Sequence, residues 1–238
     1  MSCSLVGSEM CIRDSNLGVV TTGGTTANIS ALLCARNRGL LSQENSQELS
    51  KESIYRVLSK KGYQDIVLIG SRLMHYSINK ATSILGMGTK NVVYIDTNSD
   101  GKLDLDLLVE NIRECRNKEL YVLAIVGIAG TTETGEIDPL VEMGNIAQEF
   151  GIHFHVDAAW GGATMFSERH KGKLEGIEKA DTITICGHKQ LYLPQGISVC
   201  LFKDPQMLNF AETTARYQAQ RDTSVSYTHL RAHETARH

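Results

Sequence analysis

Short apolar runs alternate with longer segments of helical periodicity along the middle of the chain. Five of these runs are rich in β-branched residues and show no strict alternation with polar residues, which is typical of strands covered on both faces of a sheet. They are residues 66–69, 92–95, 121–126, 153–156 and 182–185. The pattern therefore predicts five buried strands.

The segments between these runs place apolar residues three and four positions apart, which is the spacing of one helix face. The clearest segments are residues 74–85, 104–116 and 139–150. Asp104 can cap the helix that follows it, and Pro139 occupies a permitted first-turn position. Alternating strands and helices predict an α/β fold, with a mostly parallel sheet and helices on both of its faces.

The two ends of the chain do not share this pattern. Residues 4–15 and 225–235 show no clear period and resemble translated sequencing-adapter sequence. We therefore expect residues 1–15 and 224–238 to be non-native or disordered tails, and residues 16–223 to form one incomplete domain, a fragment. Native, poorly ordered tails are the alternative. The polar segment 42–61 is interpreted as a surface excursion within that domain.

Composition narrows the class of protein. The 238 residues are 42% hydrophobic and 21% charged, which is the balance of a soluble globular domain. The formal net charge of −3 argues against nucleic-acid binding, and no apolar run approaches the length needed to cross a membrane. The six cysteines are scattered, without metal-ligand spacing, so we expect no metal site and a reducing, cytoplasmic location.

Ligands of open α/β sheets bind beyond the carboxyl ends of the strands, where four places in this sequence carry candidate chemistry. The glycine-rich run from Thr21 to Asn28 enters a helix, so its backbone N–H groups either bind a phosphate or are simply capped. Asp157 ends an apolar strand and requires a strong donor or a structural ion pair. Lys189 follows another strand as an amine nucleophile or a surface lysine, and His75 is a ligand contact or a structural hydrogen-bonder.

The order of these motifs resembles the pyridoxal-phosphate group II amino-acid decarboxylases. The resemblance covers about residues 18–204 and is carried by TGGTTAN at 22–28, MHYS at 74–77, GTTETGEIDP at 130–139, HVDAAWG at 155–161 and GHK at 187–189. The spacing from Asp157 to Lys189 and the pair His188-Lys189 are specific, whereas the glycine-rich turn alone is not. The resemblance implies an incomplete large domain of the fold-type I class of pyridoxal-phosphate enzymes.

The resemblance also implies a cofactor, pyridoxal 5'-phosphate, and three catalytic residues. Lys189 would hold the cofactor as a Schiff base, Asp157 would pair with the pyridinium nitrogen, and His75 would stack on the ring. A protonated ring accepts the electron pair left by CO₂ far better than a neutral ring does. The remaining cofactor contacts that the resemblance implies are Gly24, Thr25, Thr26, Thr131, Ala159 and His188.

The implied activity is that of a carboxy-lyase, and the implied partner is a small-molecule substrate, an acidic L-amino acid. Aspartate giving β-alanine is preferred over glutamate giving GABA, and a homodimer is implied. The family's carboxylate anchor and mobile loop lie beyond the matched region, so the activity of this fragment is left open. Another fold-type I enzyme (an aminotransferase, aldolase or desulfurase) and a non-catalytic remnant are the alternatives. The pair His188-Lys189 and His75 argue against the first of these.

Overall fold

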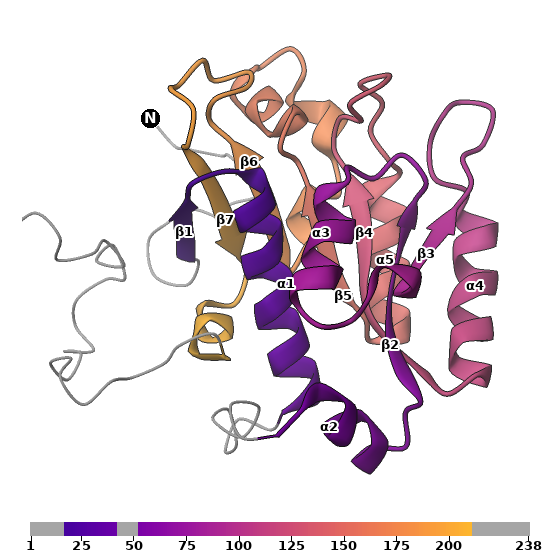
Figure 1. The fold of residues 1–238 in the computed structure, drawn as a ribbon. Coiled ribbons are helices and arrows are strands. Elements are labelled where there is room, and N and C mark those ends of the chain that lie inside the picture. The colour runs from indigo at the N-terminus through magenta and orange to yellow at the C-terminus, as the bar shows by residue number, and fades with distance from the viewer. Residues whose placement is uncertain (1–16, 42–51, 211–238) are drawn as a thin grey trace, which may run out of the picture.

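The computed structural model describes residues 17–41 and 52–210 and contains one seven-stranded sheet with the strand order β1-β7-β6-β5-β4-β2-β3. The strands are β1 (Leu17–Thr21), β2 (Asp65–Ser71), β3 (Val92–Ile95), β4 (Leu120–Ile128), β5 (His153–Asp157), β6 (Thr182–Cys186) and β7 (Ser198–Phe202). The five predicted strands are confirmed as β2 to β6. All four pairings among them are parallel, so their carboxyl ends lie together at the upper edge of the sheet in Figure 1.

The apolar pattern does not predict β1 and β7. In β7 fully buried positions alternate with half-buried ones, and the strand begins with the polar Ser198, so no continuous apolar run marks it. β7 pairs antiparallel with β6 and with the edge strand β1. The sheet is therefore mostly parallel, as predicted, with an antiparallel margin of two strands.

Five α-helices connect and cover the strands of the described ranges. They are α1 (Gly24–Leu40), α2 (Ile54–Lys60), α3 (Ser77–Ile84), α4 (Leu105–Asn117) and α5 (Leu140–Phe150). The predicted cap of α4 is confirmed, because the Asp104 carboxylate accepts hydrogen bonds from the N–H groups of Asp106 and Leu107, each 3.0 Å long. Pro139 differs from the prediction by one position, since it precedes the first helical residue, Leu140.

Helix α3 begins at Ser77, three residues later than the periodicity predicts. The N–H of Met74 donates to the carbonyl of Ser71, which closes a turn directly after β2. The N–H of Ser77 then donates to Nδ1 of His75 at 3.2 Å. Residues 72–76 therefore form a turn that presents His75 ahead of the helix.

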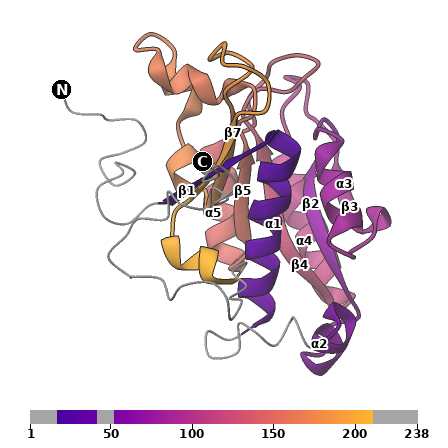
Figure 2. The ribbon, with the colours of Figure 1, turned by 60° about the vertical axis from the view of Figure 1, so that its left-hand side comes forward.

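The sheet separates two apolar cores, one on each face. Successive residues of β2 alternate between them, so that Ile66 and Leu68 pack with α1, α2 and α3, whereas Val67 and Ile69 pack with α4 and α5. Figures 1 and 2 show α1 and α3 on one side of the strands and α4 and α5 on the other. The predicted three-layer arrangement, with helices on both faces, is confirmed.

Several predictions lie outside the described residues. These are the two tails at residues 1–15 and 224–238, the domain limit at residue 223, and residues 42–51 of the polar segment. The later part of that segment forms α2. Within residues 17–41 and 52–210, no helix is both long and apolar enough to span a membrane.

Candidate active site

His75, Asp157 and Lys189 follow or end three strands whose carboxyl ends share one edge of the sheet. Asp157 is the last residue of β5, Lys189 lies three positions after β6, and His75 lies in the turn after β2. Burial lowers the pKa of His75, the charge of Asp157 raises it, and the charge of Lys189 lowers it. The fold therefore brings Asp157 and Lys189 within electrostatic range of His75.

Asp157 is 7% exposed and its carboxylate has two donors in the described structure. Oδ1 accepts the backbone N–H of Ala159 at 3.0 Å, and Oδ2 accepts the side-chain amide of Asn28 at 2.9 Å. Both donors are neutral, which differs from the alternative of a structural ion pair. Neutral donors orient the carboxylate without cancelling its charge, so the charge is available to a cationic ligand at this edge.

The start of α1 offers backbone donors at the same edge. The first intrahelical bond runs from Ala27 N–H to the carbonyl of Gly23, and no side chain caps this helix. The N–H groups of Gly24, Thr25 and Thr26 therefore have no partner within the helix. A Cβ on Gly24 would lie 2.7 Å from Sγ of Cys186, so glycine is what lets the helix start this close to β6. The arrangement suits an anionic group.

The turn that carries Lys189 is anchored at the residue that precedes β7. The N–H of Gly187 donates to the carbonyl of Ile197 at 2.9 Å, and the N–H of Tyr192 donates to the carbonyl of Lys189 at 3.1 Å. Lys189 itself is half-buried. These bonds hold the lysine backbone just beyond the carboxyl end of β6. Within the described residues the lysine amine makes no hydrogen bond or ion pair.

Buried polar atoms without a partner gather around this turn. Within the described residues they are Nδ1 of His188, Oγ1 of Thr184 and Oγ of Ser198. Thr184 is directly opposite Asp157 in the parallel ladder, and Ser198 is opposite Cys186 in the antiparallel one. Native proteins pair most buried polar atoms, so three orphans at one end of two strands indicate a place built for a polar ligand.

The other predicted contacts lie at the same edge but differ in what their side chains do. The Thr131 hydroxyl is 2.7 Å from that of Thr134, so it is engaged within its own loop. The loop is anchored by the buried carboxylate of Asp138, which accepts the N–H groups of Leu103 and Ile128, each at 2.9 Å. Ala159 contributes the N–H that orients Asp157. Thr131 is thus placed as a loop residue rather than as a free donor.

Sequence reasoning did not identify the polar residues behind Asp157. Asn28 bridges Asp157 to Nε2 of His155 at 3.1 Å, and Nδ1 of His155 is 2.9 Å from the hydroxyl of Thr182. The same hydroxyl is 2.8 Å from Nε2 of His153. The available signal is the alternation of His153, His155 and Asp157 along β5, which puts three polar side chains on one face of a buried strand.

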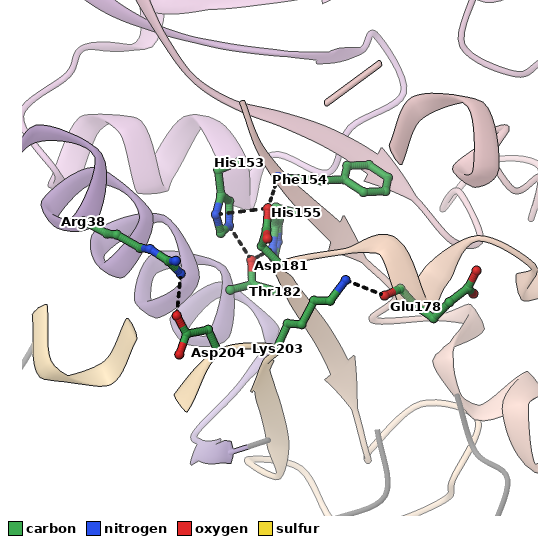
Figure 3. A network of polar contacts seen from close by, with 9 residues as sticks. All are labelled: Arg38, His153, Phe154, His155, Glu178, Asp181, Thr182, Lys203 and Asp204. Atoms are coloured by element: carbon green, nitrogen blue, oxygen red, sulfur yellow. Dashed lines mark hydrogen bonds and ion pairs between the residues drawn. The ribbon is translucent and has the colours of Figure 1, made fainter. Parts of the chain in front are cut away.

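Figure 3 shows the contacts near the amino end of β5, with His153, His155, Thr182 and Asp181 among the residues drawn as sticks. Nδ1 of His153 lies 3.6 Å from the Asp181 carboxylate, which also accepts the N–H of Phe154 at 2.8 Å. Burial lowers the pKa of His153 to about 3 and that of His155 to about 4, so both rings are neutral near pH 7. The histidines therefore act here as hydrogen-bonding groups and not as charges.

A cavity of about 370 Å³ opens beside this site. Its lining includes Trp160, His170, Lys173 and Gln190, but none of His75, Asp157 and Lys189. Gln190 faces Trp160, with its amide oxygen 3.1 Å from the indole nitrogen when the amide is placed to satisfy both groups. The cavity thus adjoins the lysine turn through Gln190, and its lining includes the basic side chains of His170 and Lys173.

Comparisons with known proteins identify the family of this chain. A family model described as the pyridoxal-dependent decarboxylase conserved domain matches residues 7–232. The chain is 43% identical over 204 residues to an aspartate 1-decarboxylase of Aliivibrio fischeri, an alignment that covers 86% of this chain and 37% of that protein. It is 36% identical over 187 residues to the L-aspartate decarboxylase dtxS4 of Metarhizium robertsii, covering 77% of this chain and 34% of that protein.

A solved structure gives the same result for the fold. The apo form of mouse CSAD superposes with a TM-score of 0.77 at 28% identity, covering 90% of this chain and 43% of that one. The chain therefore spans less than half the length of each of these relatives. The resemblance inferred from the motifs is confirmed, and this chain belongs to the pyridoxal-dependent decarboxylase family.

Proposed function

We propose that the protein to which this chain belongs decarboxylates an acidic L-amino acid with pyridoxal 5'-phosphate, held by Lys189. The observation that carries this proposal is the meeting of His75, Asp157 and Lys189 at one edge of the sheet, beside the uncapped start of α1. A carboxylate, an imidazole, an amine and free backbone donors are the groups that this cofactor needs around its ring and its phosphate.

The residues present fit the cofactor on structural grounds. The N–H groups at the start of α1 are matched to a phosphate, and Nδ1 of His188 and Oγ of Ser198 are buried polar atoms without a partner in the described structure. Asp157 is oriented by two neutral donors and retains a charge that a protonated ring nitrogen can neutralise. A bound polar group would supply the hydrogen-bond partners that these buried atoms lack in the protein alone.

When bound, pyridoxal phosphate supplies an electron sink for the pair released at Cα as CO₂ leaves. Asp157 holds a proton at the ring nitrogen, which strengthens that sink. His75 lies in a turn fixed by Ser77 and can place its imidazole flat against the ring. Lys189 would hold the cofactor through its amine.

The proposed substrate is L-aspartate, with β-alanine as the product, and L-glutamate giving GABA is the second candidate. The names of two relatives support this order, since both the Aliivibrio and the Metarhizium proteins are called aspartate decarboxylases. A third relative is named acidic amino acid decarboxylase GADL1 and is 31% identical over 214 residues. All three names share an acidic substrate.

We also propose a homodimer that is located in the cytoplasm. Several large apolar side chains are exposed near the site edge, among them Tyr76 at 66% and Tyr192 at 92%, and burial against a second copy would remove them from water. All four cysteines in the described ranges are buried free thiols, which suits a reducing compartment.

The proposal is tested by incubating the chain with pyridoxal phosphate, recording its visible spectrum, reducing with borohydride and mapping the modified peptide. The expected result is one labelled residue, Lys189. Labelling of surface lysines in proportion to their exposure, without preference for Lys189, would contradict the proposal. Release of CO₂ from L-aspartate and L-glutamate by the longer parent protein then ranks the two substrates.

A further inference from the structure

Asn28 occupies a central position that the proposed cofactor contacts do not explain. It is 1% exposed on the sheet-facing side of α1 and makes three side-chain hydrogen bonds. Its amide nitrogen is 2.9 Å from Oδ2 of Asp157 and 3.0 Å from Oγ of Ser77, and its amide oxygen is 3.1 Å from Nε2 of His155. One amide therefore joins the surroundings of Asp157 to those of His75.

The direction of each bond follows from the carboxylate of Asp157, which only accepts when ionised. The NH₂ group of Asn28 must face Asp157, so its oxygen faces His155 and accepts a hydrogen bond from Nε2–H. Because burial keeps His155 neutral, its Nδ1 then carries no proton and accepts from the hydroxyl of Thr182. The Thr182 oxygen in turn accepts from Nε2 of His153.

The second branch is fixed in the same way. Oγ of Ser77 accepts from Asn28, so its own proton is free to point at Nδ1 of His75, 2.8 Å away. The backbone N–H of Ser77 also points at that nitrogen. Nδ1 of His75 is therefore an acceptor, and the proton of the neutral ring is on Nε2.

We propose that Asn28 is a positioning residue, which fixes the Nε2–H tautomers of His75 and His155 and holds the Asp157 carboxylate in the orientation that meets the ring nitrogen of the cofactor. It acts through these three side chains and need not touch the cofactor. The proposal rests on the proposed function for its link to pyridoxal phosphate, but its hydrogen-bond assignment concerns the chain alone.

The first test is nitrogen-15 NMR of histidine-labelled chain without cofactor. The expected result is the Nε2–H tautomer for both His75 and His155 at neutral pH, with each ring assigned by loss of its signal in His75→Gln and His155→Gln. A proton on Nδ1 of either ring would overturn the assignment. This measurement uses the unmodified chain, so it does not depend on how any Asn28 variant folds.

The second test compares Asn28→Ala with Asn37→Ala. Asn37 is a matched control, because it is also buried on α1 and its amide donates to a backbone carbonyl, that of Phe210, at 2.7 Å. We expect Asn28→Ala to lose the single tautomer at His155 and to bind pyridoxal phosphate at least tenfold more weakly. Asn37→Ala should keep the tautomers and bind within about twofold of the unmodified chain.

Equal tautomer populations and equal affinities in the two variants would overturn the positioning role. Its failure is distinguishable from that of the proposed function. If borohydride labels Lys189 in the unmodified chain while the two variants behave alike, only the role of Asn28 is wrong. If Lys189 is not labelled but the tautomers depend on Asn28, the hydrogen-bond assignment stands and the proposed cofactor site is wrong.

Discussion

The two ends of β5 hold similar side chains but leave them in different states. At the amino end, the Asp181 carboxylate accepts the N–H of Phe154, and His153 is bonded to Thr182. At the carboxyl end, Asp157 is oriented by Asn28 and Ala159, while Thr184 and His188 keep buried atoms without partners. Polar groups that are satisfied within the chain contribute to stability, whereas those left over are available to a ligand.

Lys189→Ala is the change expected to have the largest effect at the carboxyl end. The variant should show no covalent adduct with pyridoxal phosphate after borohydride reduction, because no other amine adjoins Asp157 and His75 at this edge of the described structure. Its thermal unfolding should be nearly unchanged, since Lys189 is half-buried and makes no side-chain bond. Lys173→Ala, on the neighbouring cavity, is the control and should be labelled normally.

Asp157→Asn and Asp181→Asn are the same change at the two ends. At Asp157 the loss of the negative charge should weaken pyridoxal phosphate binding by about 10- to 100-fold, the effect of removing one charge-assisted hydrogen bond. At Asp181 binding should stay within about twofold, because that carboxylate bonds the backbone of Phe154. Titration of both variants by absorbance decides, and similar affinities for the two would mean that the ends do not differ as described.

The pH dependence of stability tests the comparison between the two ends of β5 through the histidines nearest its amino end. Burial lowers the pKa values of His153 and His155 to about 3 and about 4. Between these values and about pH 6.5 the unfolded chain therefore binds protons that the folded chain does not bind. The contribution of these two neutral histidines to the free energy of unfolding is full above about pH 6.5 and is lost as the pH falls toward 4. It amounts to roughly 2 kcal/mol per histidine between pH 6.5 and 5.

Urea unfolding at pH 7.5 and at pH 5 measures this loss. His155→Gln should lose less stability between the two pH values than the unmodified chain does. The exposed His170 provides the control, because His170→Gln should leave the difference unchanged. Asp138 changes the balance with the opposite sign. Burial raises its pKa from 3.8 to about 6, so its contribution to stability is lost as the pH rises between these two values. An identical pH dependence in all three proteins would contradict the assignment to His155.

Asp104→Ala should have the smallest effect and gives a baseline away from both ends. Asp104 accepts two backbone N–H groups at the start of α4, and losing such a cap costs about 1 kcal/mol. Urea unfolding should show this loss, and pyridoxal phosphate binding should not change. A weakened affinity in this variant would show that affinity follows global stability, and would remove the distinction between the two ends.

Much of the fold could be predicted because parallel strands covered on both faces are continuous apolar runs, as residues 121–126 and 182–185 show. Strands β1 and β7 were not predicted, because an edge strand and its neighbour lack such runs. Val20 in β1, for instance, is 71% exposed. The start of α3 could not be placed from periodicity, since Nδ1 of His75 binds the N–H of Ser77 and ends the preceding turn.

The candidate site was predictable only at positions where the residue type itself indicates a chemical role. Lys189 and Asp157 stand out because charges directly after apolar strands are unusual. Asn28 does not stand out, because an asparagine early in a helix is equally typical of an exposed position. Its three hydrogen-bond partners lie in α3 and β5, far away in the sequence. For the same reason Thr182, which hydrogen-bonds two histidines of the adjacent strand, was not identified from the sequence.

The pairing of β1 with β7 has a consequence for synthesis on the ribosome. Within the described residues β1 pairs only with β7, so this first described strand has no neighbour in the sheet until the last described strand has been made. At ordinary translation rates the delay is about 10 to 40 seconds. The glycine-rich start of α1 follows β1 directly and packs on β6, so this edge of the site assembles late, through contacts of high sequence separation that slow folding.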